Sequence, residues 1–154
     1  MGTNDAGNGT ETDKQAIDRL IAAFFGVFCN KGGARPALDQ MYDMFIKEGL
    51  VIKNSGPVPE IATVAQFIQP RERLLNDGTL TEFEEAEVSA RTHIAGNIAQ
   101  RISVYRKSGI LGGQPFQARG MKTAQLVRTP SGWKISCLAW DDEREGFTPS
   151  TDIL

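Results

Sequence analysis

The segment RGMKTAQLVRTPSGWKISCLAWDDER, residues 119–144, decides the fold of this chain. At its centre, Thr129-Pro130-Ser131-Gly132 places a proline early in a turn, where its fixed φ is favoured, and a glycine at the turn's exit. The segment therefore predicts two strands joined by a tight turn.

The strand after this turn has apolar residues on both of its faces. Trp133 and Ile135 begin one face, while Leu138 and Trp140 end the opposite face. Such a strand is either central in its sheet or meets a partner subunit. We therefore expect a homodimer through the sheet face, with Leu138 and Trp140 at or near the interface.

The bulk composition is that of one soluble domain. The chain has 154 residues, of which 40% are hydrophobic and 23% charged. Its net charge of −2 argues against a nucleic-acid-binding surface. We see neither an apolar run long enough for a membrane span nor a signal peptide, so a cytoplasmic location is expected.

The few metal-binding residue types argue against a metal site. The two cysteines, Cys29 and Cys137, are far apart in sequence and there is one histidine. We expect two reduced, buried thiols, with a disulfide or a reactive thiol as the alternatives. No metal and no cofactor is predicted.

The chain is expected to form one domain with two tails. Residues 1–11 are mostly glycine, asparagine, threonine and aspartate with little to bury, which predicts a disordered tail. Residues 12–146 form the predicted single domain. Residues 147–154 are expected to be a loose C-terminal tail.

Three amphipathic helices are predicted in the first half. The first and third begin after Thr12 and Thr63, each with a glutamine three residues later that completes a capping box. The second begins at Pro36 and ends near Gly49, before a short strand. Pro70 lies inside the third helix and is expected to break or kink it.

From residue 79 the apolar period changes from helical to alternating, which predicts long strands. Gly96-Asn97 predicts a hairpin turn, and residues 108–113 predict a glycine-rich connection. Together with the two strands described first, this gives a four-stranded antiparallel meander. Strands this long must twist and carry bulges. We therefore predict an α+β fold in which three N-terminal helices pack on a strongly curved antiparallel sheet, with a pocket between them.

This order of elements resembles the nuclear transport factor 2-like superfamily, whose cystatin-like cone fold is shared with ketosteroid isomerases and SnoaL-type polyketide cyclases. The resemblance is carried by the helix IDRLIAAFF, the passage LDQMYDMFIKEGLVIKNSG and the hairpin LVRTPSGWKISCLAWDDER. It covers about residues 13–145. It implies a small molecule bound in the cone and a homodimer through the open sheet face.

The acids of the isomerases are absent from this chain. The resemblance places one aspartate at the end of the strand after the second helix, where this chain has Ile52-Lys53-Asn54. It places a second on the strand before the final turn, where this chain has Met121-Lys122-Thr123-Ala124. Steroid isomerisation by that pair of acids is therefore not expected.

Six residues are candidates for ligand contact: Tyr42, Phe45, Asn54, Phe67, His93 and Arg101. The two catalytic candidates among them are His93, the only histidine, and Asn54, at a strand end where a catalytic group often lies. Tyr42 combines an apolar ring with a polar tip, as a pocket wall requires. The alternative for His93 is an exposed or paired structural residue.

The acidic clusters favour ion pairs over catalysis. Glu85 and Glu87 share a face of their strand, and a cross-strand arginine such as Arg101 would form an ion-pair ladder with them. The acids at 141–143 point alternately to opposite faces, so solvated charges or salt bridges are expected there.

Two functions stay open at this point. The first is a domain that binds a small hydrophobic molecule in the cone, with isomerase, lyase or hydratase chemistry as the enzymatic option. The second is a non-catalytic dimeric module that binds or scaffolds a protein partner. A cavity of several hundred cubic ångströms would favour the first.

Overall fold

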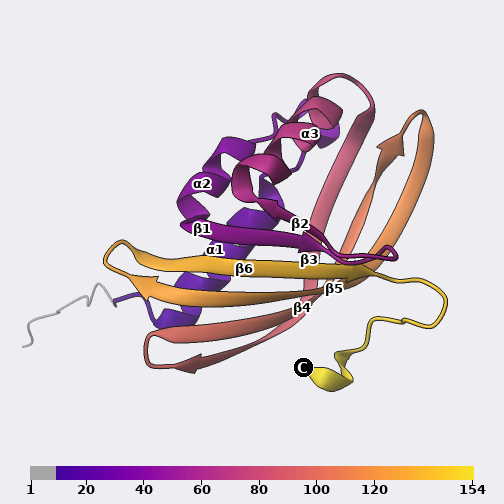
Figure 1. The fold of residues 1–154 in the computed structure, drawn as a ribbon. Coiled ribbons are helices and arrows are strands. Elements are labelled where there is room, and N and C mark those ends of the chain that lie inside the picture. Colours follow the sequence, from indigo (N-terminus) through magenta and orange to yellow (C-terminus); the bar gives the residue numbers. More distant parts are fainter. Residues whose placement is uncertain (1–9) are drawn as a thin grey trace, which may run out of the picture.

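A computed structural model describes residues 10–154, so the predicted tail over residues 1–11 lies almost wholly outside the described part of the chain. The α-helices lie in the first half of the chain, where two strands separate the second α-helix from the third, and four long strands follow them (Figure 1). The α-helices are α1 (Asp13–Gly26), α2 (Met41–Met44) and α3 (Val64–Asn76), and 3-10 helices span Lys31–Gly33, Leu38–Gln40 and Thr151–Ile153.

Six strands form one mixed sheet in the order β2-β1-β6-β5-β4-β3. Their bounds are β1 Phe45–Lys53, β2 Glu60–Thr63, β3 Leu80–Ala95, β4 Ile98–Leu111, β5 Gln114–Thr129 and β6 Gly132–Asp142. The predicted antiparallel meander is confirmed for β3 to β6. The prediction of a wholly antiparallel sheet is wrong, because β1 joins β6 in parallel.

The predicted turns of the meander are present. The chain reverses at Gly96-Asn97 and again at Pro130-Ser131, and Gly96 and Gly132 both have the positive φ that favours glycine. The glycine-rich connection is shorter than predicted, because β4 continues through residues 108–111 and only Gly112-Gly113 form the turn.

The second predicted helix is largely wrong. Its α-helical part is limited to α2, and from Phe45 onward the backbone is extended. This segment gains backbone hydrogen bonds on both sides by pairing with β2 and β6, and such tertiary pairing overrides a local helical pattern. The strand β2, which precedes α3, was not expected from the sequence.

Helix α3 begins as predicted but does not break. Thr63 and Gln66 form a reciprocal capping box, as Thr12 and Gln15 do at α1. The helix continues through Pro70 to Asn76. A proline inside a helix costs roughly 3 kcal/mol. Burial of Phe67 and Leu75 on either side of Pro70 offsets this cost.

A bulge in β6 places all of its large apolar residues on one face. The pairing of Gln125 with Cys137 is followed by that of Leu126 with Ile135, so Ser136 has no opposite residue. The extra residue reverses the alternation, as β-bulges do. Trp133 and Ile135 before Ser136 are therefore buried, and so are Leu138 and Trp140 after it.

This register places Leu138 and Trp140 in the core of the chain and not on an exposed sheet face, where they were expected to meet a partner subunit. Leu138 is 2% exposed and Trp140 is 8% exposed, and both belong to the core cluster within the chain. The Trp140 ring packs edge-on against Phe67 of α3 at 5.7 Å between centroids. The two-sided apolar pattern therefore reflects the bulge, and the predicted homodimer cannot rest on these two residues.

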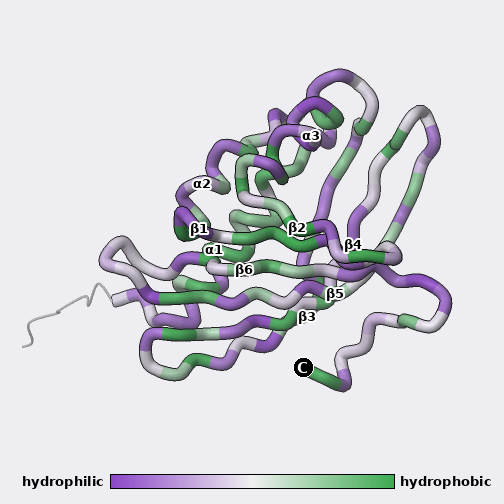
Figure 2. Tube along the Cα trace, viewed as in Figure 1, coloured by the Kyte–Doolittle hydropathy of each residue, from purple (hydrophilic) through white to green (hydrophobic). Residues whose placement is uncertain are grey.

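The long strands β3, β4 and β5 bend along their length (Figure 1), and bulges interrupt the pairing of β3 with β4 near Glu84 and Ser89. Polar and apolar residues alternate along these strands (Figure 2). The face that contacts the helices is called the concave face below, and the opposite face is called the outer face. Two aromatic contacts lie on the concave face. Phe24 of α1 packs against Phe45, and Phe67 of α3 packs against Trp140.

The C-terminal segment 147–154 leaves the sheet after β6. Phe147 forms an isolated bridge with Arg144, and a 3-10 helix covers Thr151–Ile153. Arg91 of β3 donates a hydrogen bond to the main-chain oxygen of Leu154 at 2.6 Å. Among the described residues, no helix has both the length and the hydropathy needed to cross a membrane.

Candidate functional site

A cavity of about 350 Å³ lies between α1, α3 and the concave face of the sheet. This volume is within the range of small-molecule sites. Its lining residues are Phe24, Phe28, Lys53, Phe67, Pro70, Arg71, Leu74, Leu75, Leu80, Phe83, Glu85, Lys107, Leu111, Phe116, Lys122 and Trp140. A larger hollow of about 500 Å³ is lined mainly by charged and polar residues of β3, β4 and β5. We take the first as the candidate site, because it alone of the two combines apolar walls with buried charge.

Six aromatic residues line the cavity. Phe67 packs edge-on against both Phe28, at 6.0 Å, and Trp140, at 5.7 Å between centroids. Phe83 and Phe116, also in the lining, are stacked at 6.4 Å between centroids. Edge-on and offset contacts of this kind fix the ring positions. These contacts leave apolar ring surface facing the cavity.

One buried ion pair interrupts the apolar wall. Lys122 Nζ lies 2.8 Å from Glu85 Oε1, and the side chains are 8% and 7% exposed. The contact does not have hydrogen-bond geometry, so Glu85 Oε1 accepts no hydrogen bond from the described residues. Burial lowers the pKa of Lys122, although the charge of Glu85 acts in the opposite direction. The pair thus places a donor and an acceptor at the cavity wall.

A second polar group lies behind this pair. The hydroxyl of Tyr105, a fully buried residue, donates a hydrogen bond to Asp142, which also accepts one from Lys107 Nζ at 3.0 Å. Burial and the hydrogen bond to Asp142 raise the pKa of Tyr105, so its hydroxyl stays neutral. Burial opposes ionisation of Asp142, yet the Tyr105 hydrogen bond and the charge of Lys107 keep the pKa of Asp142 below its ordinary value.

Arg71 of α3 lies against the aromatic wall. Its guanidinium carbon is 3.7 Å from the centroid of the Phe67 ring and 5.7 Å from that of Trp140. Burial lowers the pKa of Arg71 to about 10, so the guanidinium remains charged at neutral pH. A cation held over ring faces is stabilised by their negative potential. The cavity lining contains four basic residues, Lys53, Arg71, Lys107 and Lys122, and a single acidic residue, Glu85.

The structure separates most of the residues predicted to form the site. Phe67 lines the cavity, and Phe45 lies behind it in the core, against Phe24. Tyr42 is 53% exposed on α2, and Asn54 is exposed just after β1. His93 is exposed and points to the outer face of β3. The two residues predicted to be catalytic therefore lie outside the cavity.

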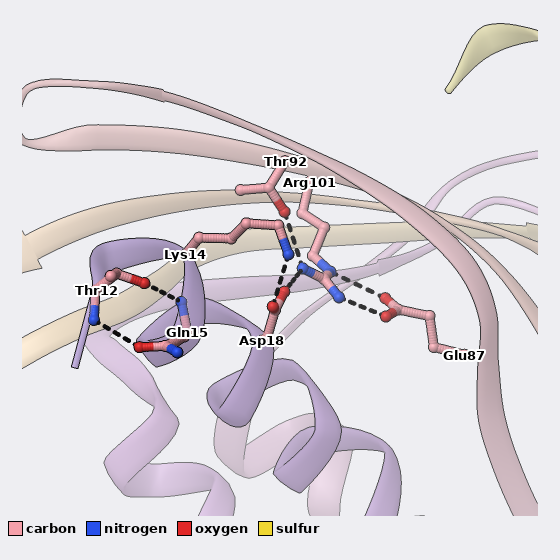
Figure 3. A network of polar contacts seen from close by, with 7 residues as sticks. All are labelled: Thr12, Lys14, Gln15, Asp18, Glu87, Thr92 and Arg101. Atoms are coloured by element: carbon pink, nitrogen blue, oxygen red, sulfur yellow. Dashed lines mark hydrogen bonds and ion pairs between the residues drawn. The ribbon is translucent and has the colours of Figure 1, made fainter. Parts of the chain in front are cut away.

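Arg101 is buried in a network of its own (Figure 3). Its guanidinium donates hydrogen bonds to Glu87, to Asp18 of α1 at 2.6 Å and to Thr92 at 2.8 Å. The predicted pairing of Glu87 with Arg101 is confirmed, and Ser103 adds a further bond to Glu87. With its donors engaged, Arg101 fixes α1 to β3 and β4. It does not line the cavity.

The cavity lysines were missed from the sequence, although a signal was present. The isomerase resemblance directs attention to residues 52–54 and 121–124, where acids are missing. Each of these stretches contains a lysine, and both Lys53 and Lys122 line the cavity. The chain therefore has amines in the two stretches from which carboxylates were expected to act.

The two cysteines are free thiols, and both are half-buried. Burial raises the pKa of Cys137, which lowers the fraction present as reactive thiolate. Neither Cys29 nor Cys137 lines the cavity.

No protein-family model and no curated protein matches this sequence. Its fold is similar to that of solved structures. A nuclear transport factor 2 (NTF2-like) superfamily protein from Salmonella enterica superposes with a TM-score of 0.71 at 15% identity, over 91% of this chain and 96% of that one. An uncharacterized protein with a cystatin-like fold from Caulobacter vibrioides superposes with a TM-score of 0.67 at 16% identity, over 87% and 92% of the two chains.

A third similar structure is an NTF2-like protein of unknown function from Prochlorococcus, with a TM-score of 0.68 at 14% identity over 86% of this chain and 94% of that one. The predicted resemblance to the NTF2-like superfamily is thus confirmed at the level of the fold. A shared fold does not fix an activity, so function has to be argued from the site.

Proposed function

We propose that this chain, which has the cystatin-like fold of NTF2-like proteins, binds a small and mainly apolar molecule in the concave cavity. The observation that carries the proposal is a cavity of about 350 Å³ whose aromatic walls are interrupted by one buried ion pair. The apolar body of a ligand would displace water from the rings, and a polar group would meet Lys122 and Glu85. Burial of apolar surface supplies roughly 25 cal/mol per Å².

Glu85 gives this site an enzymatic option. Its Oε1 atom lies 2.8 Å from Lys122 Nζ, at the cavity wall. A carboxylate in that position can accept a proton from a bound ligand, which is a step common to isomerases, lyases and hydratases. We therefore propose Glu85 as the catalytic candidate, instead of His93 and Asn54, which were predicted from the sequence.

Thermal unfolding with a panel of small aromatic compounds tests the binding proposal. A ligand at one hundred times its dissociation constant stabilises the native state by about 2.7 kcal/mol, which raises the melting temperature measurably. Leu74→Trp would fill the cavity from α3, so its melting temperature should no longer respond to ligand. Val58→Trp adds the same ring at an exposed loop position, 65% exposed, and should respond as the wild type does.

Two outcomes would contradict this proposal. One is a panel in which no compound shifts the melting temperature of the wild type. The other is an equal shift in the wild type and in Leu74→Trp, since the ligand would then bind elsewhere.

We also propose a homodimer through the outer face of the sheet. Exposed apolar residues on this face support it, since Leu50 is 38% exposed and Ile98 is 53% exposed. In sedimentation velocity the wild type should then sediment as a dimer and the variant Leu50→Glu as a monomer. A wild type that is monomeric at micromolar concentration would refute the dimer without affecting the cavity.

A further inference from the structure

We propose that Lys122 captures carbonyl compounds: its Nζ forms an imine with an aldehyde or ketone held in the concave cavity. This inference rests on the proposed ligand site and names the chemical class of its ligand. Lysine amines that form imines lie in apolar surroundings with an acid–base group beside them. Lys122 meets both conditions.

The surroundings of Lys122 set it apart from the other cavity amines. Its Nζ lies 4.1 Å from the centroid of the Tyr105 ring and 4.8 Å from that of Trp140. Its one charged partner within ion-pair distance is Glu85, among the described residues. Lys107, in contrast, donates a hydrogen bond to Asp142 and is 20% exposed. The Lys122 amine is therefore shielded from bulk water but faces the cavity.

The amine of Lys122 also loses its proton more readily than that of a surface lysine. Burial lowers its pKa. Each unit by which the pKa of an amine falls increases its unprotonated, nucleophilic fraction about tenfold. Transfer of one proton from Lys122 to Glu85 removes both charges from the apolar wall, which favours the neutral amine when ligand has displaced water.

The reaction balances with these two groups alone. Lys122 gives a proton to Glu85, and the free electron pair of Nζ attacks the carbonyl carbon while the carbonyl π electrons move to oxygen. Glu85 delivers its proton to that oxygen and takes one from nitrogen, which gives a neutral carbinolamine. Glu85 then protonates the hydroxyl group, water leaves, and the nitrogen pair forms the C=N bond. The products are a protonated imine, the Glu85 carboxylate and one water.

The free acceptor on Glu85 fits this sequence. Its Oε1 atom lies 2.8 Å from Lys122 Nζ and accepts no hydrogen bond from the described residues. It is therefore close enough to Nζ to take up and return the protons of this sequence. The rings of Phe67 and Trp140 would hold the apolar part of the carbonyl compound, so an aryl aldehyde is a suitable probe.

Reductive trapping of the wild-type protein is the direct test. The protein is incubated with benzaldehyde and cyanoborohydride, digested and mapped by mass spectrometry. Each trapped lysine gains the mass of the aldehyde less one oxygen atom. At low conversion, modification of Lys122 should clearly exceed that of Lys53 or Lys107, the other cavity lysines.

Benzyl alcohol, which cannot form an imine, separates this inference from the ligand site itself. If it raises the melting temperature and competes with trapping at Lys122, both proposals are supported. If it raises the melting temperature but trapping at Lys122 does not exceed that at the other lysines, the imine is refuted and the ligand site stands. If neither compound affects the protein, both proposals are refuted.

Two variants complete the test. Lys122→Met alone leaves Glu85 buried without its partner, which destabilises the fold. The double variant Lys122→Met with Glu85→Gln removes both charges and should fold. It should show no trapping above the level of exposed lysines. Glu85→Gln alone keeps the amine, and its trapping rate at Lys122 should fall at least about tenfold if Glu85 transfers the protons.

Discussion

Gly120 occupies a position in β5 where no side chain fits. In the sheet it lies opposite Tyr105 on one side and Asp142 on the other. A Cβ atom there would overlap the Tyr105 hydroxyl and the carbonyl oxygen of Asp141. The hydrogen bond from Tyr105 to Asp142 behind the cavity therefore requires glycine at this position.

Gly120→Ala should consequently lower the free energy of unfolding by roughly 1–3 kcal/mol, as overpacked sites do. Urea denaturation monitored by circular dichroism measures this change. Gly26→Ala is the matched control, since a Cβ at the end of α1 meets nothing within 4 Å. Equal stability of the two variants would show that Tyr105 is not held in the way described.

Asp13 gives the chain a defined sensitivity to acid. Hydrogen bonds donated by Arg128 and Trp133 lower the pKa of Asp13 from its ordinary value of 3.8 to about 2. A carboxylate with a lowered pKa contributes stability that is complete above the unfolded-state pKa and is lost as the pH falls through the folded-state pKa. The contribution of Asp13 should therefore disappear between pH 3.8 and about pH 2.

The variant Asp13→Asn tests this pH dependence. At neutral pH it should be less stable than the wild type, because it loses the ion pair with Arg128, whose nitrogen lies 2.7 Å from the carboxylate. The difference in unfolding free energy should shrink as the pH falls below 3.8. Urea titrations at several pH values measure it, and a difference that is constant down to pH 2 would contradict the account.

At the scale of single elements, the bulge at Ser136 decides which residues of β6 reach the core. Deletion of Ser136 would force either Trp133 and Ile135 or Leu138 and Trp140 onto the outer face. Exposure of two large apolar side chains costs about 1.5–3 kcal/mol for each of them. The deletion variant should therefore lose cooperative thermal unfolding.

Ser136→Ala is the control for this deletion. It removes the hydrogen bond from the serine hydroxyl to the Gln125 carbonyl, at 3.1 Å, but keeps the register. The loss should be about 0.5–1.5 kcal/mol. A deletion variant as stable as Ser136→Ala would show that β6 tolerates either register.

Local signals in the sequence were sufficient for element ends and for the meander. The capping boxes at Thr12 and Thr63 and the turn at Pro130 depend on neighbouring residues, and all are present in the structure. The helix predicted up to Gly49 was wrong, because pairing of Phe45–Lys53 with two strands is a long-range effect. The position of the bulge could not be predicted. Strict alternation of side chains along β6 would place Trp140 on the face opposite to Trp133, and nothing in the sequence marks Ser136 as the extra residue.

At the scale of the whole molecule, the cavity exists because distant segments meet. Glu85 of β3 and Lys122 of β5 are separated by strand β4, and Arg71 comes from α3. No spacing in the sequence brings these three residues together. What the sequence could predict was a pocket between helices and sheet, and Phe67 as one of its walls.

Fluorescence of Trp140 is the most direct measurement of ligand binding in the cavity. The chain has two tryptophans, and Trp140 lines the cavity while Trp133 does not. In a Trp133→Phe variant the emission therefore reports on Trp140 alone. Titration with a small aromatic ligand such as benzyl alcohol should change this emission until the site is saturated. The cavity variant used here is Leu74→Phe, because it narrows the cavity and weakens the response without adding another tryptophan.

The account predicts a saturable change in Trp140 emission, and a weaker response when Leu74→Phe is added to the Trp133→Phe variant. It would be contradicted by an emission that does not change at any ligand concentration, or by a response that Leu74→Phe leaves unaltered.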